Sequence, residues 1–126
     1  MSAWSRNARY SLQRQIKKTA NYTVVVVTDS AKIFASVLDA IVYTLPSIAT
    51  GELYSFINLA EDGDAKVSIS PASADGISYA GVSVDNKDLI NTKATALKGD
   101  YATVASFDGA DHWQVAEVSG LWQAEA

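Results

Sequence analysis

The sequence contains no cysteine and only one histidine. Without cysteine, the chain has no disulfide, no thiolate metal ligand and no cysteine nucleophile. The single histidine, His112, would have to be the base of any Ser-His-Asp triad. No Gly-x-Ser-x-Gly elbow is present to supply the serine, so the pattern gives that triad no support. We therefore interpret His112 as a turn or surface residue, and we expect a protein that binds rather than catalyses.

Long apolar runs are also missing. The longest strongly apolar run is the four valines at 24–27, whereas a membrane-spanning helix needs about 20 apolar residues. No apolar segment follows the arginines near the N-terminus, so we expect neither a signal peptide nor a membrane partner. These absences predict a protein made in the cytoplasm and stabilised by packing or by assembly.

Acidic residues are plentiful, but they lie mostly where turns are expected. The segment 61–64, Glu-Asp-Gly-Asp, lacks the ligand spacing of an EF-hand calcium loop. No glycine-rich phosphate loop leads from a strand into a helix, so we expect no metal and no cofactor. A small hydrolase that uses a carboxylate pair stays a less favoured alternative, because such a site needs only two acids about 5–10 Å apart across a cleft.

Charge is distributed unevenly along the chain. Five of the ten basic residues lie within residues 1–18, which contain no acid, whereas all 14 acidic residues lie in the rest of the chain. A basic segment before an acidic body indicates a negatively charged partner surface. Because nucleic acid would repel the acidic body, we expect a protein partner or a second copy of the chain. Nucleic acid is the less favoured alternative, with aromatic side chains stacking on bases.

We interpret residues 1–20 as an N-terminal arm and residues 21–126 as one folded domain. Apolar residues recur every four positions in the arm, which fits one face of a short helix or the anchors of an extended segment. Tryptophan and tyrosine are favoured at interfaces. The candidate contact residues are the apolar anchors and the basic residues of the arm: Trp4, Arg6, Arg9, Tyr10, Leu12, Arg14, Ile16, Lys17 and Lys18.

The domain reads as short β-branched and aromatic segments separated by turn residues. The predicted strands cover residues 22–28, 31–36, 41–45, 53–59, 65–70, 101–107 and 112–118, with Asp108-Gly109 as the hairpin turn between the last two. Residues 77–84 hold one or two further short strands, interrupted by Gly81. Segment 85–96 is ambiguous between a short strand near 89–90 and a loop. Strands of this length and spacing predict an all-β fold, a β-sandwich or a jelly-roll-like domain.

Several of these segments have a recognisable order. Residues 22–34 contain Tyr-Thr-Val and then Asp-Ser-Ala-Lys-Ile-Phe, residues 43–46 are Tyr-Thr-Leu-Pro, residues 53–56 are Leu-Tyr-Ser-Phe, and residues 108–113 are Asp-Gly-Ala-Asp-His-Trp. This order resembles a module of structural proteins of tailed bacteriophages, in which the position of Ala31 is often a glycine. The resemblance covers residues 21–122, although segment 85–96 matches no part of the module.

The resemblance implies a non-enzymatic virion protein. The module occurs in capsid decoration (cement) proteins, head fibres and tail fibres, commonly as trimers. A fibre needs a long shaft, whereas here only residues 1–20 precede the module, so we expect a decoration protein. It would sit as a homotrimer on the capsid exterior, with its arm on the major capsid protein. The alternative is a receptor- or glycan-binding tip domain of a tail fibre, in which Tyr79, Trp113 or Trp122 would stack on sugars.

Overall fold

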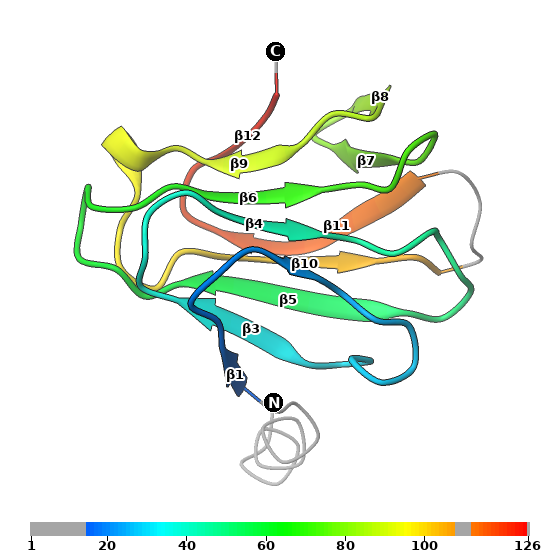
Figure 1. Cartoon of the computed structure of the whole chain (residues 1–126). Coiled ribbons are helices and arrows are strands. Elements are labelled where there is room, and N and C mark those ends of the chain that lie inside the picture. The colour runs from blue at the N-terminus through cyan, green and yellow to red at the C-terminus, as the bar shows by residue number, and fades with distance from the viewer. Residues whose placement is uncertain (1–14, 108–111, 126) are drawn as a thin grey trace, which may run out of the picture.

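The computed structural model describes residues 15–107 and 112–125, and two β-sheets make up its body (Figure 1). Sheet A has seven strands in the order β1 (Gln15–Lys17), β3 (Ile33–Ser36), β5 (Leu53–Asn58), β10 (Tyr101–Ala105), β11 (His112–Ser119), β7 (Gly76–Tyr79) and β8 (Val82–Asp85). Sheet B has five, in the order β12 (Trp122–Ala124), β9 (Leu89–Asn91), β6 (Val67–Ser70), β4 (Ile41–Thr44) and β2 (Tyr22–Thr23). Within the described residues, the helical structure is one short 3-10 turn, Lys93–Thr95. The predicted all-β sandwich is confirmed.

The first six strands alternate between the two sheets. Strands two apart along the chain therefore become parallel neighbours: β1, β3 and β5 in sheet A, and β2, β4 and β6 in sheet B. The later strands add antiparallel pairs, among them the β7–β8 and β10–β11 hairpins. Both sheets thus contain parallel and antiparallel pairs. In the first half of the chain, the strand that separates two parallel neighbours in sequence belongs to the opposite sheet.

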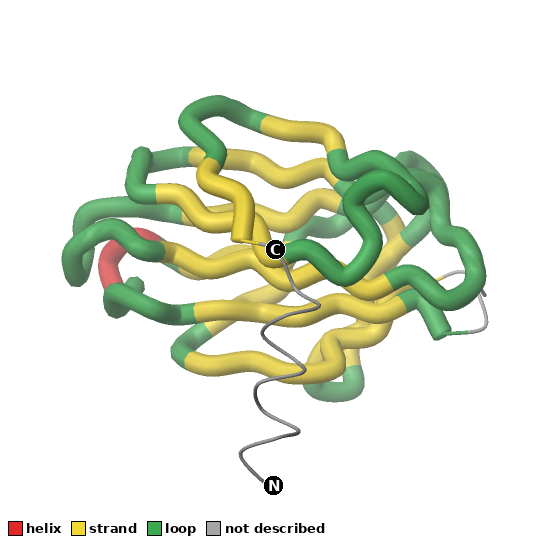
Figure 2. Tube along the Cα trace, turned by 90° about the horizontal axis from the view of Figure 1, so that it is seen from below, coloured by secondary structure: helices red, strands yellow, loops and turns green. Residues whose placement is uncertain are grey.

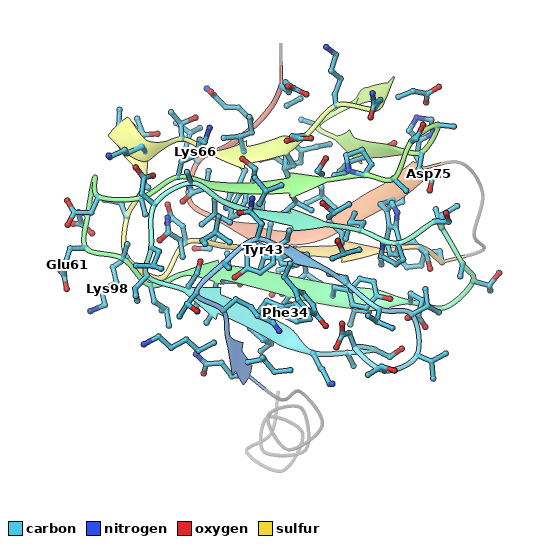
Figure 3. All side chains as sticks on the ribbon, viewed as in Figure 1. Phe34, Tyr43, Glu61, Lys66, Asp75 and Lys98 are labelled. Atoms are coloured by element: carbon cyan, nitrogen blue, oxygen red, sulfur yellow. The ribbon has the colours of Figure 1, made fainter. Side chains whose placement is uncertain are left out.

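Parallel pairing in register stacks like side chains from one strand to the next. Ile16, Phe34 and Phe56 occupy equivalent positions of β1, β3 and β5, and the Phe34 and Phe56 rings stack with centroids 5.6 Å apart. Tyr43 of sheet B packs against Phe56 with ring centroids 4.9 Å apart and against Phe34 with ring centroids 5.8 Å apart; Figure 3 labels Phe34 and Tyr43. Each fully buried aromatic ring contributes about 1.5–3 kcal/mol, so these stacked rings form the centre of the core.

Several predicted strand limits differ from the structure. The strand expected over 22–28 ends at Thr23, because residues 26–31 turn and Val25 and Val27 are exposed. Within the ambiguous segment 85–96 the alternative of a short strand is correct, as β9 pairs with β6 and β12. Strand β1 lies within the segment predicted as the arm, so the first described residue, Gln15, already belongs to sheet A.

Loops gather at the two ends of the strands (Figure 2). We call the end at which β1, β3 and β5 begin the arm end, because the first described residue, Gln15 of β1, lies there. The arm end also holds the loop of residues 24–32, the turn of residues 45–52 and the end of β10. The opposite end, which we call the far end, holds the turns of residues 37–40, 59–66 and 92–100.

Candidate protein-binding surface at the arm end

Three apolar side chains are exposed at the arm end. Val25 is 47%, Val27 77% and Phe107 60% exposed, and we call these three residues the apolar loop cluster. Phe107 and Val27 both bond to the turn of residues 45–52. The Gly51 amide donates to the Phe107 carbonyl (2.9 Å), and the Val27 amide donates to Glu52 Oε1 (3.2 Å). Single exposed apolar residues are ordinary, but a group of them indicates a contact surface.

A buried carboxylate, Asp29, fixes the loop that carries Val25 and Val27. Its Oδ2 accepts hydrogen bonds from the Tyr22 hydroxyl (2.7 Å) and the Val25 amide (2.8 Å), and its Oδ1 lies 3.4 Å from Lys32 Nζ. Burial alone would raise the pKa of Asp29, but these three donors lower it, and the pKa lies below its usual value. Asp29 is therefore ionised at neutral pH, and its carboxylate links the Val25 amide inside the loop to the side chains of Tyr22 and Lys32 on either side of it.

A second buried carboxylate, Glu52, holds the same loop from the neighbouring turn. It accepts hydrogen bonds from the Ser30 hydroxyl (2.8 Å), the Tyr54 hydroxyl (2.5 Å) and the Val27 amide (3.2 Å). Burial opposes its ionisation, but the bonds from Tyr54, Ser30 and Val27 outweigh this and lower its pKa. Conversely, burial and the hydrogen bond to Glu52 raise the pKa of the Tyr54 hydroxyl, which keeps its proton and remains a donor. The loop is thus fixed to a core strand.

The backbone of the apolar loop cluster is strained. Val27 has φ 69° and Phe107 has φ 49°, in the left-handed region that costs an L-residue roughly 1–2 kcal/mol. A β-branched residue is a rare occupant of that region. Such strain persists only where surrounding groups impose it, and it concentrates at functional sites. Asp29 and Glu52 supply that constraint for the loop that carries Val25 and Val27, and the Gly51 amide holds the Phe107 carbonyl.

The arm enters the fold beside this loop. Gln15, the first residue of β1, pairs with Ile33, which directly follows the loop. Of the predicted contact residues, Ile16 is half-buried and packs against the core, while Lys17 is exposed. The ammonium of Lys18 lies 3.5 Å from the centre of the Tyr22 ring. The remaining predicted contacts lie outside the described residues: Trp4, Arg6, Arg9, Tyr10, Leu12 and Arg14.

The aromatic residues predicted to stack on sugars in the tail-fibre alternative are buried or half-buried. Trp113 is 0% and Trp122 2% exposed, so the prediction that they stack on a glycan is wrong. Tyr79 is half-buried in β7. His112 begins β11 and is half-buried, with Nε2 3.0 Å from Asp85 Oδ1. The described surface therefore offers no exposed tryptophan for a ligand.

The acidic segment 61–64 lies at the far end and contacts a neighbouring turn. The Lys98 amide donates to Asp62 Oδ1 (2.9 Å), and Lys98 Nζ lies 3.2 Å from Glu61 Oε1 (Figure 3). Among the residues placed by the structure, no three His, Asp or Glu side chains gather as metal ligands do. In residues 15–107 and 112–125, no helix has the length and hydropathy to cross a membrane.

The residues that build this surface were missed by reasoning from the sequence. The valine run 24–27 has the composition of a buried strand, and nothing in it marks Val27 for a left-handed backbone. The partners Glu52 and Tyr54 lie more than 20 residues further along the chain, so no local pattern joins them to the loop. The Asp29-Ser30 pair was the one available signal, because it indicated a turn close by. A scan against protein-family models and a search of curated proteins both find no match for this chain.

Proposed function

We propose that the protein is a structural virion protein that binds the outer surface of a bacteriophage capsid and stabilises the shell across capsomer joints, as a homotrimer. One observation carries the proposal beyond the sequence resemblance. The root of the basic arm and the rigid apolar loop cluster share one end of the sandwich. A basic segment of sequence beside a fixed apolar surface is a combination suited to binding another protein.

The two parts make different contributions to binding. The basic residues of the arm would steer the protein to an acidic patch of the major capsid protein, which raises the association rate. The loop that carries Val25 and Val27 needs little ordering on contact, because Asp29 and Glu52 already hold it, and pre-organisation reduces the entropic cost of binding. In a trimer, three such ends act together through their effective concentration.

The charge of the far end agrees with this orientation. Glu61, Asp62 and Asp64 are all exposed there. With the arm end on the shell, these acids would face solvent, where net negative charge keeps particles soluble and apart. The opposite orientation would press an acidic turn and its Lys98 contact against the capsid.

Co-sedimentation with expanded, DNA-free capsids tests the proposal. The capsids are assembled from the major capsid protein encoded in the same genome as this chain. We expect the full chain to pellet with them, and a variant lacking residues 1–14, which keeps β1, to bind at least tenfold more weakly. We expect the same loss for Val27→Asn with Phe107→Asn, because asparagine tolerates a left-handed backbone and removes the apolar contact.

The matched control is Leu97→Asn with Leu121→Asn. These two side chains are 55% and 48% exposed at the far end, so the control removes similar apolar surface away from the arm. It should bind capsids as the unaltered chain does. A full-length chain that stays in the supernatant refutes the proposed function. Unchanged binding by both the truncated and the Val27/Phe107 variants refutes the role of the arm end.

A further inference from the structure

The two most exposed large apolar side chains of the described residues belong to the apolar loop cluster. Val27 is 77% and Phe107 60% exposed, and we call these two residues the exposed pair. The Val27 amide donates to Glu52 Oε1. The Gly51 amide donates to the Phe107 carbonyl, so consecutive residues of one turn hold both backbones. Removing both side chains from water is favourable, and a segment that covers them would therefore stabilise the molecule.

The chain's own N-terminal segment is attached at the same end of the sandwich. Gln15, at the beginning of β1, pairs with Ile33 of β3, and residues 1–14 precede it in the sequence. Sheet A continues from β3 to β5 and then to β10, and Phe107 follows shortly after the end of β10. Neighbouring strands lie about 4.8 Å apart, so roughly 14 Å separates the path of β1 from that of β10.

Residues 1–14 are long enough to reach the exposed pair. An extended chain spans about 3.3–3.6 Å per residue, so about four residues cover this separation, and Leu12 and Tyr10 would lie within reach. A helix rises about 1.5 Å per residue, so about ten residues cover it, and Trp4 would lie within reach. The apolar anchors of the segment can therefore meet the exposed pair in either conformation that the sequence favours.

The segment and the surface around the exposed pair are complementary in chemistry. Residues 1–14 contain three arginines, no acid and three of the predicted apolar anchors: Trp4, Tyr10 and Leu12. The loops of residues 24–32 and 45–52 contain two carboxylates and one lysine, a net charge of −1. That lysine, Lys32, lies 3.4 Å from Asp29, so no unpaired cation of these two loops opposes the arginines. An apolar surface with a slightly negative base suits a basic, aromatic segment.

We propose that, in the free chain, residues 1–14 bind over the exposed pair of the same molecule. The covalent link gives the segment a high effective concentration at this surface, so a few apolar contacts are enough. The contact keeps Val27 and Phe107 out of water until a partner is met. On a capsid the segment would leave the pair and both would bind the shell, so the contact belongs to the free chain. Its test uses no capsid, so this inference and the proposed function can fail separately.

Thiol labelling tests this contact directly, because the chain has no cysteine of its own. Val27→Cys places a single thiol in the exposed pair. We expect N-ethylmaleimide, an uncharged reagent, to label it at least fivefold more slowly in the full chain than in the same variant lacking residues 1–14. Nearby arginines would favour the thiolate and speed labelling, so slower labelling reports cover and not charge. Equal rates in the full and the truncated chain overturn the proposal.

Two controls show that the effect is local and comes from the apolar anchors. Leu97→Cys places the thiol at a side chain that is 55% exposed at the far end, and truncation should leave its labelling rate unchanged. In the full chain with Val27→Cys, serine at all three anchors (Trp4, Tyr10 and Leu12) should give the fast rate. Serine at the polar positions Asn7 and Gln13 should keep the slow one. Circular dichroism confirms that each variant folds.

Protein concentration identifies the occupant of the exposed pair. A contact within one molecule does not depend on concentration, so the labelling rate at position 27 should stay constant over about a hundredfold range. Protection that appears only at the higher concentrations would assign the pair to a second copy of the chain and overturn the proposal. Protection that survives serine at all three anchors would overturn the role of those side chains.

Discussion

Replacing Glu52 by glutamine tests whether a buried carboxylate holds the apolar loop cluster. The side chain keeps its shape but loses its charge. Glu52 is 8% exposed and accepts bonds from the Val27 amide and the Tyr54 hydroxyl at Oε1 and from Ser30 at both oxygens. Glutamine can keep the bonds from Val27 and Tyr54 at its carbonyl oxygen, but in place of Oε2 it presents an amide group to Ser30.

The expected loss follows from the difference between charged and neutral acceptors. Hydrogen bonds to charged groups contribute about 1.5–3 kcal/mol and neutral ones about 0.5–1.5 kcal/mol. Two bonds weakened by about 1 kcal/mol each give a loss of about 2 kcal/mol, or roughly 6–10 °C in Tm for a chain of this size. Glu52→Ala should cost about 4 kcal/mol, because it also leaves the buried Tyr54 hydroxyl without an acceptor.

Urea unfolding at two pH values measures this loss. The pKa of Glu52 is lowered in the folded state, so its contribution is present above the unfolded pKa, about 4.3, and disappears as pH falls through the folded value. The stability gap between the unaltered protein and the Glu52→Gln variant should therefore be full at about pH 7 and small at about pH 3. Hydrogen exchange of the Val27 amide should accelerate in the variant. A gap below about 0.5 kcal/mol at neutral pH refutes the account of the loop.

Three further changes have expected outcomes in thermal or urea unfolding. Val27→Asn should stabilise the protein by about 0.5–1 kcal/mol, since asparagine accepts the left-handed backbone, whereas Val25→Asn, at a position without positive φ, should not. Gly120→Ala should cost more than about 3 kcal/mol, because Gly120 has φ 89° and an alanine Cβ there would also collide with the Asp100 carboxyl group. Gly63→Ala should cost only about 1 kcal/mol, because a Cβ at Gly63 meets no atom within 4 Å and only the positive φ opposes it. Burial raises the pKa of Asp88, so the folded state favours its protonated form and stability rises as pH falls through that pKa. Asp88→Asn should consequently raise Tm at about pH 7 and leave it unchanged at about pH 3; a loss at neutral pH contradicts this.

The all-β architecture could be predicted because period-two alternation is a local property. Residues 41–45, 65–70 and 101–107 each show it, and each contains a strand of the structure. Parallel pairing could not be predicted in the same way, since a strand has the same alternation beside a parallel or an antiparallel neighbour. The alternation of β1 to β6 between sheets is a property of the whole chain.

The candidate site was harder to predict for a physical reason. A run of four valines is normally buried, and here its conformation depends on two carboxylates, one of which comes from a turn more than 20 residues further along the chain. Asp29 and Glu52 gain enough from their hydrogen bonds to hold Val27 in a strained, exposed conformation. Conversely, the alternative of a glycan-binding domain predicts exposed rings at Trp113 and Trp122, but burying a large ring in the core stabilises the fold more than leaving it in water.

A cryo-electron microscopy map of a decorated capsid tests the central claim most directly. The proposal predicts that the loop of residues 24–32, Phe107 and residues 1–14 face the shell, with the acidic turn of residues 61–64 toward solvent. A map in which the far end contacts the major capsid protein, and the apolar loop cluster faces solvent, would contradict it.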